Sequence, residues 1–436
     1  MKILLIGKFP PIEGGVSAHT FWLARSLVRN GHAVHLVTNS SEIEPNFAQV
    51  HYGRDHEWLA GAGDATAWSI HQTTPLENGS FIPFSQPHVT KLFGLSLSVL
   101  EQFDCDIIVS WYFEPYGMVA ALVGQATGRP FVVRHAGSDL GRLARHPQLA
   151  SAYRWALKAA AGLVVINERE LETRFGPIDR PRIPLSRPRL PDVFYTAHER
   201  LDVKELLAAS GEWFTNLKLP NDLTGNIRRL NAKPLGDNVF AIGIYGKVGV
   251  TKGSFDLLDA LGKVAATGTK FAFFSMSCGR REMLRRYYET ILNCPALAAR
   301  SWILPPVAPW RVPAFLRCCD AVCFLEREFA IPFHGPLIPR EILSSGACLV
   351  CSLEIAGKPI YRGNLVDERN AVIVADPKDH DTLAAKLCRL VRDRSRTRSI
   401  GLQGRKLAEF WDEELDSFDR TTQMFAEKLE RLKLRN

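Results

Sequence analysis

The sequence lacks the features that would place the protein in a membrane, a disulfide-rich class or a structural zinc class. No apolar run approaches the ~18–20 residues of a membrane-spanning helix, and the first apolar stretch, Ile3–Ile6, is too short for the core of a signal peptide. The 9 cysteines are an odd number and form no Cys/His cluster with zinc spacing. We therefore expect a cytoplasmic protein without a structural metal, in which cysteine acts as a small hydrophobic residue.

The composition is typical of a folded globular protein. Of the 436 residues, 46% are hydrophobic and 23% are charged, which excludes a largely disordered or fibrous chain. The length predicts two or three domains, since one domain usually takes ~100–200 residues. The formal net charge of +8 is compatible with nucleic acid, an anionic membrane surface or a phosphorylated small molecule as the partner, and charge alone does not choose among them.

The order of strand-like and helix-like segments in the first half predicts an α/β fold. The apolar strand Lys2–Ile6 is followed by a Pro/Gly loop, a helix that ends at Asn30-Gly31, and a second strand at Ala33–Val37. This order is a βαβ unit, which begins a parallel sheet. No elements are assigned between about residues 40 and 100, and regular segments resume at strand 107–110, helix 116–126, strand 131–133, helix 149–160 and strand 162–166.

A second βαβ series begins at residue 239. Strands are predicted at 239–245, 271–275, 301–304, 321–325, 348–352 and 371–374, and helices at 255–265, 381–393 and 418–434. Ligands of open parallel sheets bind at the carboxyl ends of the strands. We therefore expect two doubly wound, Rossmann-like domains that face each other across a cleft. Their predicted boundaries are residues 1–190 and 239–410, with an irregular linker at 191–238 and a C-terminal helix within 411–436.

A glycine-rich loop follows the first strand of each half. Gly14-Gly15 precedes the first helix, and the loop Gly246–Gly253 carries Lys247 and Lys252 before the helix at 255–265. Glycine lets backbone N–H groups approach an anion at a helix N-terminus, and lysines add fixed positive charge there. The second loop therefore predicts a diphosphate site. Neither loop has the G-x-G-x-x-G spacing of a dinucleotide site, and the second is not a P-loop.

Further candidate residues follow other predicted strands. The proline-rich segment from His334 brings Glu341 into the first turn of a short helix, where its carboxylate could accept hydrogen bonds from two neighbouring sugar hydroxyls. His135 would lie at a strand end, where a group that titrates near neutral pH is useful. The aromatic loop 111–117 could stack on a sugar ring. Each has a structural alternative: a helix-dipole partner, a hydrogen-bonded histidine, or aromatic core.

Two other patterns are weaker signals. Asp104-Cys105-Asp106 spells the D-x-D pattern linked to metal-bound nucleotide sugars, but it directly precedes a strand, where acidic residues are common. The alternating arginines of 392–398 favour a solvated surface, with contact to an anionic membrane or a lipid-linked acceptor as the alternative.

Together these loops resemble those of family 4 glycosyltransferases, which have the GT-B fold. The resemblance rests on Gly14-Gly15, the segment around His135, the loop Gly246–Gly253 and the Pro339-Arg340-Glu341 block. It covers most of the chain and is weakest over 40–100 and 202–237. It implies that residues 1–190 bind the acceptor, that residues 239–410 bind a nucleotide-sugar donor, and that the helix in 411–436 packs back on the N-terminal domain.

The resemblance implies a role for each matching residue. Lys252 would bind the donor diphosphate, Glu341 the nucleotide ribose, and His135 would lie near the transferred sugar, so these three are the predicted catalytic residues. The predicted donor-binding set is Gly14, Gly15, Gly246, Lys247, Lys252, Gly253, His334, Arg340 and Glu341. The predicted acceptor-binding set is Tyr112, Glu114, Ser138 and Asp139.

The sequence departs from the family pattern at two positions. Lys247 stands where the family usually has arginine, and lysine keeps the charge but lacks the planar guanidinium fork. Phe333 stands eight positions before Glu341, where the family has the first of two paired glutamates. We expect Glu326, Glu328 or His334 to contact the sugar instead, and this departure leaves the donor identity and activity itself open.

The resemblance implies transfer of a hexose-type sugar from a nucleotide diphosphate to a hydroxyl acceptor, with retention of configuration and without a metal. Lysines and helix N-termini would neutralise the leaving diphosphate. The expected acceptor is a glycan, a glycolipid or a small molecule, with peripheral contact to an anionic inner membrane face as an option and no nucleic acid. A non-catalytic homologue that binds a nucleotide sugar is the first alternative. A nucleotide-dependent oxidoreductase or epimerase is less favoured, because a Tyr-x-x-x-Lys pair is also absent.

Overall fold

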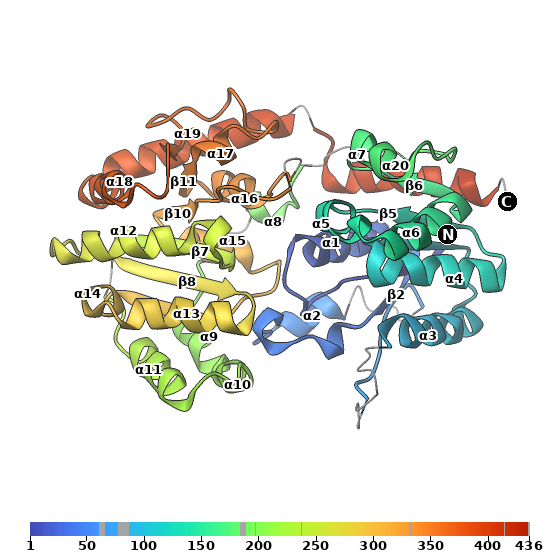
Figure 1. Ribbon diagram of the computed structural model, residues 1–436, viewed down its shortest axis with the longest axis horizontal. Coiled ribbons are helices and arrows are strands. Elements are labelled where there is room, and N and C mark those ends of the chain that lie inside the picture. The colour runs from blue at the N-terminus through green and yellow to red at the C-terminus, as the bar shows by residue number, and fades with distance from the viewer. Residues whose placement is uncertain are drawn as a thin grey trace. The chain divides into compact units, whose positions relative to one another are not determined.

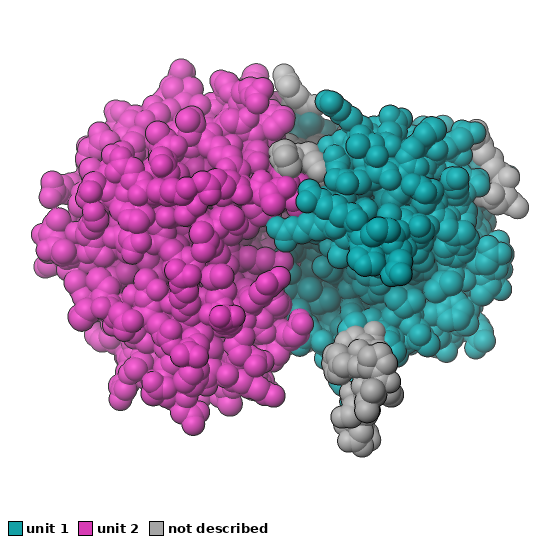
Figure 2. Space-filling view, in the orientation of Figure 1, with its two compact units in different colours: residues 1–43, 53–189, 415–436 teal, residues 44–52, 190–414 magenta. Residues whose placement is uncertain are grey.

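The computed structural model describes residues 1–60, 66–76, 87–183, 189–196, 198–236, 238–331, 334–413 and 415–434. The chain divides into two compact units, which Figure 2 shows in different colours. Unit 1 consists of residues 1–43, 53–189 and 415–436, and unit 2 consists of residues 44–52 and 190–414.

Unit 1 is built on a six-stranded parallel sheet with the strand order β3-β2-β1-β4-β5-β6. The central strand β1 pairs with β2 on one side and with β4 on the other, so that Ile3 lies opposite both Val34 and Ile107. The strand order therefore reverses between β1 and β4, and the carboxyl edge at such a reversal is where doubly wound sheets bind ligands. The strands are β1 (Lys2–Gly7), β2 (Ala33–Thr38), β3 (Trp68–Gln72), β4 (Ile107–Trp111), β5 (Phe131–Arg134) and β6 (Gly162–Val164).

The helices of unit 1 bury apolar faces against this sheet. In α1, residues at helical spacing, including Phe21, Ala24 and Leu27, are buried because they face the core. The α-helices are α1 (Gly15–Arg29), α2 (Asp55–Leu59), α3 (His88–Phe103), α4 (Met118–Thr127), α5 (Gly137–Gly141), α6 (Pro147–Ala159), α7 (Glu168–Phe175) and α20 (Phe418–Lys433). Short helical turns are η1 (Ser40–Glu42), η3 (Phe113–Gly117) and η4 (Leu143–Arg145).

The C-terminal helix α20 is part of unit 1, although the preceding 225 residues, 190–414, belong to unit 2 (Figure 1). It packs against α1. The carboxylate of Asp419 accepts hydrogen bonds from the Ser26 hydroxyl and from the Arg29 guanidinium, the latter at 2.6 Å. Phe425 and Leu429 of α20 are fully buried, so this contact has both a polar and an apolar part.

Unit 2 repeats the architecture with the strand order β12-β11-β10-β7-β8-β9. The strand β7 pairs with β8 on one side and with β10 on the other, so here the order reverses between β7 and β10. The strands are β7 (Ala241–Lys247), β8 (Ala272–Cys278), β9 (Ser301–Leu304), β10 (Ala321–Phe324), β11 (Cys348–Ser352) and β12 (Val372–Val374). The two doubly wound sheets confirm the predicted fold class.

Helices follow the strands of unit 2, and further helices precede its first strand, β7 (Figure 1). They are α8 (Val193–Thr196), α9 (Val203–Ala209), α10 (Gly211–Asn216), α11 (Asn221–Asn231), α12 (Ser254–Ala266), α13 (Arg281–Leu292), α14 (Pro295–Ala298), α15 (Val312–Cys318), α16 (Ile338–Ser345), α17 (Leu353–Ala356), α18 (His380–Arg392) and α19 (Arg394–Glu413). Short turns are η2 (Pro45–Phe47) and η5 (Val250–Lys252).

Two stretches without predicted elements contain regular structure. The region 40–100 holds β3 and the sixteen-residue helix α3, which buries Leu92, Val99 and Leu100. The predicted irregular linker 191–238 instead holds α8 to α11, and these helices belong to unit 2. They form because each buries a few apolar residues, such as Leu206 of α9 and Ile227 of α11, among polar positions that face solvent.

The cysteines and the helices show no sign of a disulfide or of a membrane span in the described residues. Cys348 and Cys351 have Cys-x-x-Cys spacing, but both are buried in β11, where side chains three residues apart point to opposite faces. Within the described ranges, no helix is long and apolar enough to cross a bilayer.

Candidate functional site

The loop between β7 and α12 lies at the strand-order reversal of unit 2. Gly246 has a φ of +97°, a left-handed value that favours glycine. The turn η5 ends with Lys252, and the N–H of Gly249 donates to the Ser254 hydroxyl at 3.2 Å. The loop therefore carries Lys252 to the carboxyl edge of the sheet, directly before the first turn of α12.

Gly253 allows this loop to approach the end of β10. Its φ is +66°, and a Cβ atom at this position would lie 2.3 Å from the carbonyl oxygen of Leu325. The backbone N–H of Arg327 also donates to the Thr251 carbonyl at 2.9 Å. Only glycine fits between these two segments, which places Lys252 beside the residues that follow β10.

Lys252 is paired with Glu326, the second residue after β10. The Lys252 Nζ donates to Glu326 Oε2, and the side chains are 23% and 0% exposed, respectively. The ammonium group also lies 3.9 Å from the ring centroid of Phe329. Burial raises the pKa of Glu326, while the nearby Lys252 charge opposes this shift. Glu326 Oε1 has no hydrogen-bond partner within the described chain, so this carboxylate is only half satisfied.

His334 completes this group. Its Nε2 atom lies 3.7 Å from Glu326 Oε2, and its ring centroid lies 4.7 Å from that of Phe329. Burial and the cations of Lys252 and Lys358 lower the pKa of His334 to about 4, so the imidazole is neutral at pH 7. The structure thus brings together three predicted residues, Lys252, Glu326 and His334, while Phe333 lies outside the described residues.

Glu341 lies at the same edge, in the first turn of α16. The hydroxyl of Tyr245, in β7, donates to Glu341 Oε2. Lys252 lies in the loop after β7, and Glu341 lies in α16, which follows β10. Since β7 and β10 are paired, both residues lie at the strand-order reversal. A carboxylate and a cation at one sheet edge can bind the polar hydroxyls and the anionic phosphates of a nucleotide, respectively.

The predicted donor residue Arg340 has a different environment. It is 1% exposed, and its guanidinium binds the carboxylate of Asp412, which also accepts a hydrogen bond from Tyr195. The ion pair joins α16 to α19, and the hydrogen bond from Tyr195 to Asp412 also joins α8 to α19. We therefore assign Arg340 a structural role, because its charge already has a buried partner.

Lys247 and Glu328 are more exposed than the central group. Lys247 Nζ lies 5.6 Å from the ring centroid of Phe47, which also belongs to unit 2. The Glu328 side chain is 64% exposed and binds Lys378, which lowers the pKa of this carboxyl group. Of the two glutamates predicted to contact the sugar, only Glu326 is therefore in contact with Lys252.

In unit 1, Gly14 and Gly15 form the start of α1. Gly14 has a φ of +126° and precedes the helix, and Gly15 is its first residue and is exposed. Among the described residues, no atom lies within 4 Å of a Cβ built at either position, so close packing does not explain the two glycines.

His135 follows β5 and is 2% exposed. Its Nε2 accepts the N–H of Ile166 at 2.9 Å, and its Nδ1 lies 3.2 Å from the carbonyl oxygen of Ala136. These contacts place the proton on Nδ1. Burial lowers the pKa of His135 to about 4. Both ring nitrogens therefore have backbone partners, which favours a positioning role.

The four predicted acceptor residues lie close together after β4 and β5. The Tyr112 hydroxyl is 2.8 Å from the Ser138 hydroxyl, and Glu114 Oε2 accepts from Tyr153 at 3.4 Å. Asp139 is fully buried and accepts hydrogen bonds from three backbone N–H groups. Burial raises the pKa of Asp139 to about 6. Asp139 therefore organises the loop, Glu114 and Ser138 are partly accessible, and Tyr112 is largely buried with 9% exposure.

Several site residues were not predicted from the sequence. Tyr245 binds Glu341, Phe329 lies under Lys252, and Lys358 lowers the pKa of His334. Tyr245 could have been found, because it is near the end of a predicted strand whose loop was already a candidate. Lys358 could not, because no spacing links it to the other residues.

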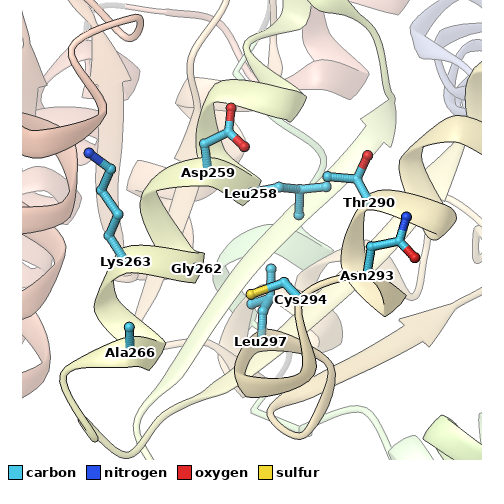
Figure 3. A pocket seen from close by; sticks show the side chains of 9 residues that line it. All are labelled: Leu258, Asp259, Gly262, Lys263, Ala266, Thr290, Asn293, Cys294 and Leu297. Atoms are coloured by element: carbon cyan, nitrogen blue, oxygen red, sulfur yellow. The ribbon is translucent and has the colours of Figure 1, made fainter.

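A surface hollow of about 480 Å³ lies elsewhere in unit 2, between α12, α13 and α14 (Figure 3). Its lining includes Lys263 and Ala266 near the end of α12, and Asn293 just after α13. Helices that follow parallel strands end at the amino edge of the sheet, opposite the Lys252 loop. The hollow is therefore separate from the candidate site.

The described residues contain no group of three or more His, Cys, Asp or Glu side chains arranged to hold a metal ion. Asp104 and Asp106 of the D-x-D pattern bind Arg129 and Lys433, at the amino end of β4. Metal independence stays a prediction.

Residues 14–184 match a family model described as a glycosyl transferase 4-like domain. Similar solved structures include sucrose-phosphate synthase from Thermosynechococcus elongatus, with a TM-score of 0.59 and 14% identity over 100% of both chains. Anabaena HepE in complex with UDP-glucose has a TM-score of 0.58 and 16% identity over 99% of this chain and 100% of that chain.

The fold is GT-B. WaaG, a glycosyltransferase involved in lipopolysaccharide biosynthesis, also shares it, with a TM-score of 0.54 and 14% identity over 95% of this chain and 99% of that chain. No curated protein sequence matches the chain. The family match covers residues 14–184, in unit 1, and the candidate site in unit 2 lies at the sheet edge where a doubly wound domain binds its ligand.

Proposed function

We propose that this GT-B protein transfers a sugar from a nucleotide-diphosphate sugar to a hydroxyl of an acceptor, with retention of configuration and without a metal. The observation that carries the proposal is the position of Lys252 in the loop after β7, with Glu341 on the helix after the paired strand β10. A related GT-B protein, HepE, has been solved with UDP-glucose and with UDP. We propose the same ligand class for unit 2 of this chain.

Lys252 would bind the donor diphosphate, assisted by Lys247 and by the N-terminus of α12. As the bond between the sugar and the diphosphate breaks, negative charge grows on the leaving phosphate oxygen. A cation and a helix N-terminus placed there in advance stabilise this charge, and such electrostatic stabilisation is often the largest catalytic contribution. The acceptor oxygen would bond to the anomeric carbon on the face that the diphosphate leaves, and its proton would pass to the leaving phosphate.

Glu341 would accept hydrogen bonds from the two ribose hydroxyls of the nucleotide, with Tyr245 fixing the orientation of its carboxylate. Neutral His334, whose side chain is 30% exposed, would contact the transferred sugar in place of the family glutamate that is Phe333 here. Glu326 is fully buried, so it would act indirectly by orienting Lys252 and His334. The acceptor would bind unit 1 through Tyr112, Glu114 and Ser138.

A non-catalytic homologue that binds nucleotide sugars is the second candidate. The observation that favours it is the Lys252–Glu326 ion pair, because the cation needed for the leaving diphosphate already has a buried carboxylate partner. Such a protein would bind a nucleotide diphosphate without releasing it from a nucleotide sugar.

A calorimetric panel of UDP, GDP and ADP, followed by assays of nucleotide release from the matching nucleotide sugars, separates the two candidates. We expect one nucleotide to bind the wild type, and to bind Lys252→Ala at least about tenfold more weakly, since a charged hydrogen bond contributes about 1.5–3 kcal/mol. Lys263→Ala is the matched control, because Lys263 lies on α12 and, in the described part of the chain, forms a surface ion pair with Asp381. Binding without release in the presence of acceptors would support the non-catalytic homologue, and no nucleotide binding would reject both.

A further inference from the structure

The carboxyl edge of unit 1 carries a cation that the proposed function does not use. Arg134 is the last residue of β5 and pairs in register with Trp111, the last residue of β4. The guanidinium carbon of Arg134 lies 4.6 Å from the Trp111 ring centroid. This stacking holds the planar group over the indole and leaves its N–H edge for other partners.

Within the described chain, the Arg134 guanidinium has no hydrogen-bond acceptor, and its Nε atom is buried without a partner. Asp139 is the acidic group whose charge acts on the Arg134 guanidinium. The Asp139 carboxylate, however, is already bound by the backbone N–H groups of Ala136, Phe113 and Leu140. Burial lowers the pKa of Arg134 to about 10, which is the direction expected for a poorly compensated cation.

Two neighbouring residues add donors at this edge. Lys8 follows β1, the strand next to β4, and its Nζ lies 4.3 Å from the ring centroid of Tyr112. His19, on α1, stacks on Trp111, and its Nδ1 accepts the indole N–H at 3.1 Å. Burial and the Arg134 charge lower the pKa of His19 to about 3, so the ring is neutral and carries its proton on Nε2.

We propose that Arg134, assisted by Lys8 and His19, forms a subsite in unit 1 for a phosphoryl group of the acceptor. The proposal rests on the proposed function in calling the ligand the acceptor, while the anion site itself does not depend on it. A guanidinium binds a phosphate through two parallel N–H bonds, and a second cation matches the second negative charge of a phosphate monoester. The edge lies at the strand-order reversal between β1 and β4, the place where a doubly wound sheet binds its ligand.

Isothermal titration of the full chain with inorganic phosphate, at constant pH and ionic strength, tests this subsite. The variants are Arg134→Gln and Arg134→Lys, with Arg154→Gln as the control, because Arg154 is an exposed arginine on α6 of the same unit. We expect Arg134→Gln to bind phosphate at least about tenfold more weakly, Arg134→Lys to be intermediate, and the control to match the wild type. Acetate, a singly charged carboxylate, should bind the wild type more weakly than phosphate.

Lys252→Ala separates this site from the donor site. Unchanged phosphate affinity in Lys252→Ala, together with the loss in Arg134→Gln, supports the subsite even if no nucleotide binds, in which case only the proposed function fails. Absence of phosphate binding to the wild type, equal affinity in Arg134→Gln, or loss in Lys252→Ala alone would each overturn the subsite. If Arg134→Gln does not fold, as judged by its melting transition, Arg134→Lys decides: wild-type phosphate affinity in that variant overturns the proposal.

Discussion

The ammonium group of Lys252 donates a hydrogen bond to the carboxylate of Glu326, a side chain with 0% exposure. The pair links the loop after β7 to the segment after β10, the two strands at the reversal of unit 2. In our proposal Lys252 therefore has two roles: it compensates the charge of a buried carboxylate, and it binds the donor diphosphate. Mutations can separate these two roles.

Lys252→Ala should lose both stability and nucleotide binding. Removal of the cation leaves Glu326 buried without its partner, which we expect to lower the free energy of unfolding by about 1–3 kcal/mol. The double variant Lys252→Ala/Glu326→Gln removes the buried charge as well, so its melting temperature should recover while nucleotide affinity stays low. Recovery of affinity along with stability would show that Lys252 acts only on the fold.

Glu341→Gln should weaken nucleotide binding with little effect on the fold. If the carboxylate binds the ribose hydroxyls, the loss should be about tenfold in nucleotide affinity, because a charge-assisted hydrogen bond becomes a neutral one. Tyr245→Phe removes only the hydroxyl that orients Glu341, and should cause a smaller loss. A Glu341→Gln variant with wild-type affinity but stability reduced by ~0.3–1 kcal/mol would reduce Glu341 to a partner of the α16 dipole.

Arg340→Met should destabilise unit 2 without changing its nucleotide affinity. The substitution leaves the buried carboxylate of Asp412 without its cation, and breaking such an ion pair costs about 3–5 kcal/mol. Chemical denaturation would measure this loss, and calorimetry on the folded variant would measure binding. The double variant Arg340→Met/Asp412→Leu should recover part of the stability, and a large loss of nucleotide affinity in Arg340→Met would restore Arg340 to the donor site.

Gly253→Ala should be more damaging than Gly128→Ala. Both glycines have similar left-handed φ values, +66° and +70°, but only at Gly253 would the Cβ meet an atom, the Leu325 carbonyl oxygen at 2.3 Å. Gly128→Ala should therefore cost only the backbone strain, about 1–2 kcal/mol, while Gly253→Ala also moves the Lys252 loop away from β10. Equal unfolding free energies for the two variants would contradict the close approach.

His135 should make a contribution to folding stability that is lost as the pH is lowered from 7 to 5. The pKa of His135 is lowered from 6.5 to about 4, so the unfolded chain takes up this proton as the pH falls through 6.5 while the folded chain does not. The contribution amounts to about 2 kcal/mol lost between pH 7 and pH 5. Asp139 acts in the opposite direction, because its pKa is raised from 3.8 to about 6 and the folded chain takes up its proton first.

His135→Gln isolates the histidine contribution, since a glutamine amide does not titrate but its oxygen can accept the Ile166 N–H. The difference in unfolding free energy between wild type and variant should shrink as the pH is lowered from 7 to 5. A difference that stays constant over this range would show that His135 is not held neutral in the folded protein.

Local patterns in the sequence were enough to predict the two sheets, apart from the edge strand β3, and the loop of Lys252. Strands such as Ile3–Ile6 are continuous apolar runs, and the glycines and lysines of 246–253 are adjacent in sequence. The helices α8 to α11 were missed because each is short and buries only a few apolar residues, a weak periodic signal. The helix α3 was missed although Leu92, Val99 and Leu100 follow helical spacing.

Partner identity was the part of the site that could not be predicted. Arg340 was placed at the donor because it precedes Glu341, yet its partner Asp412 is 72 residues away on α19. Glu326 and Glu328 could not be ranked from sequence, because only the packing of β10 against β7 shows that Glu326 binds Lys252 and Glu328 binds Lys378. The role of His135 could not be predicted either, because its burial and its contacts with backbone atoms decide that role.

The path of the chain between the two units limits how the protein can be divided. Residues 44–52 belong to unit 2, where Val50 forms a β-bridge with Val307, and α20 returns to cover α1 of unit 1. A fragment cut after residue 189 would remove Asp419 from Ser26 and Arg29 and expose the apolar surface that Phe425 covers. It would also carry residues 44–52 without the rest of unit 2, to which they belong. Neither half is thus an autonomous module, and shuffling one of them into a chimera requires grafting its detached pieces as well.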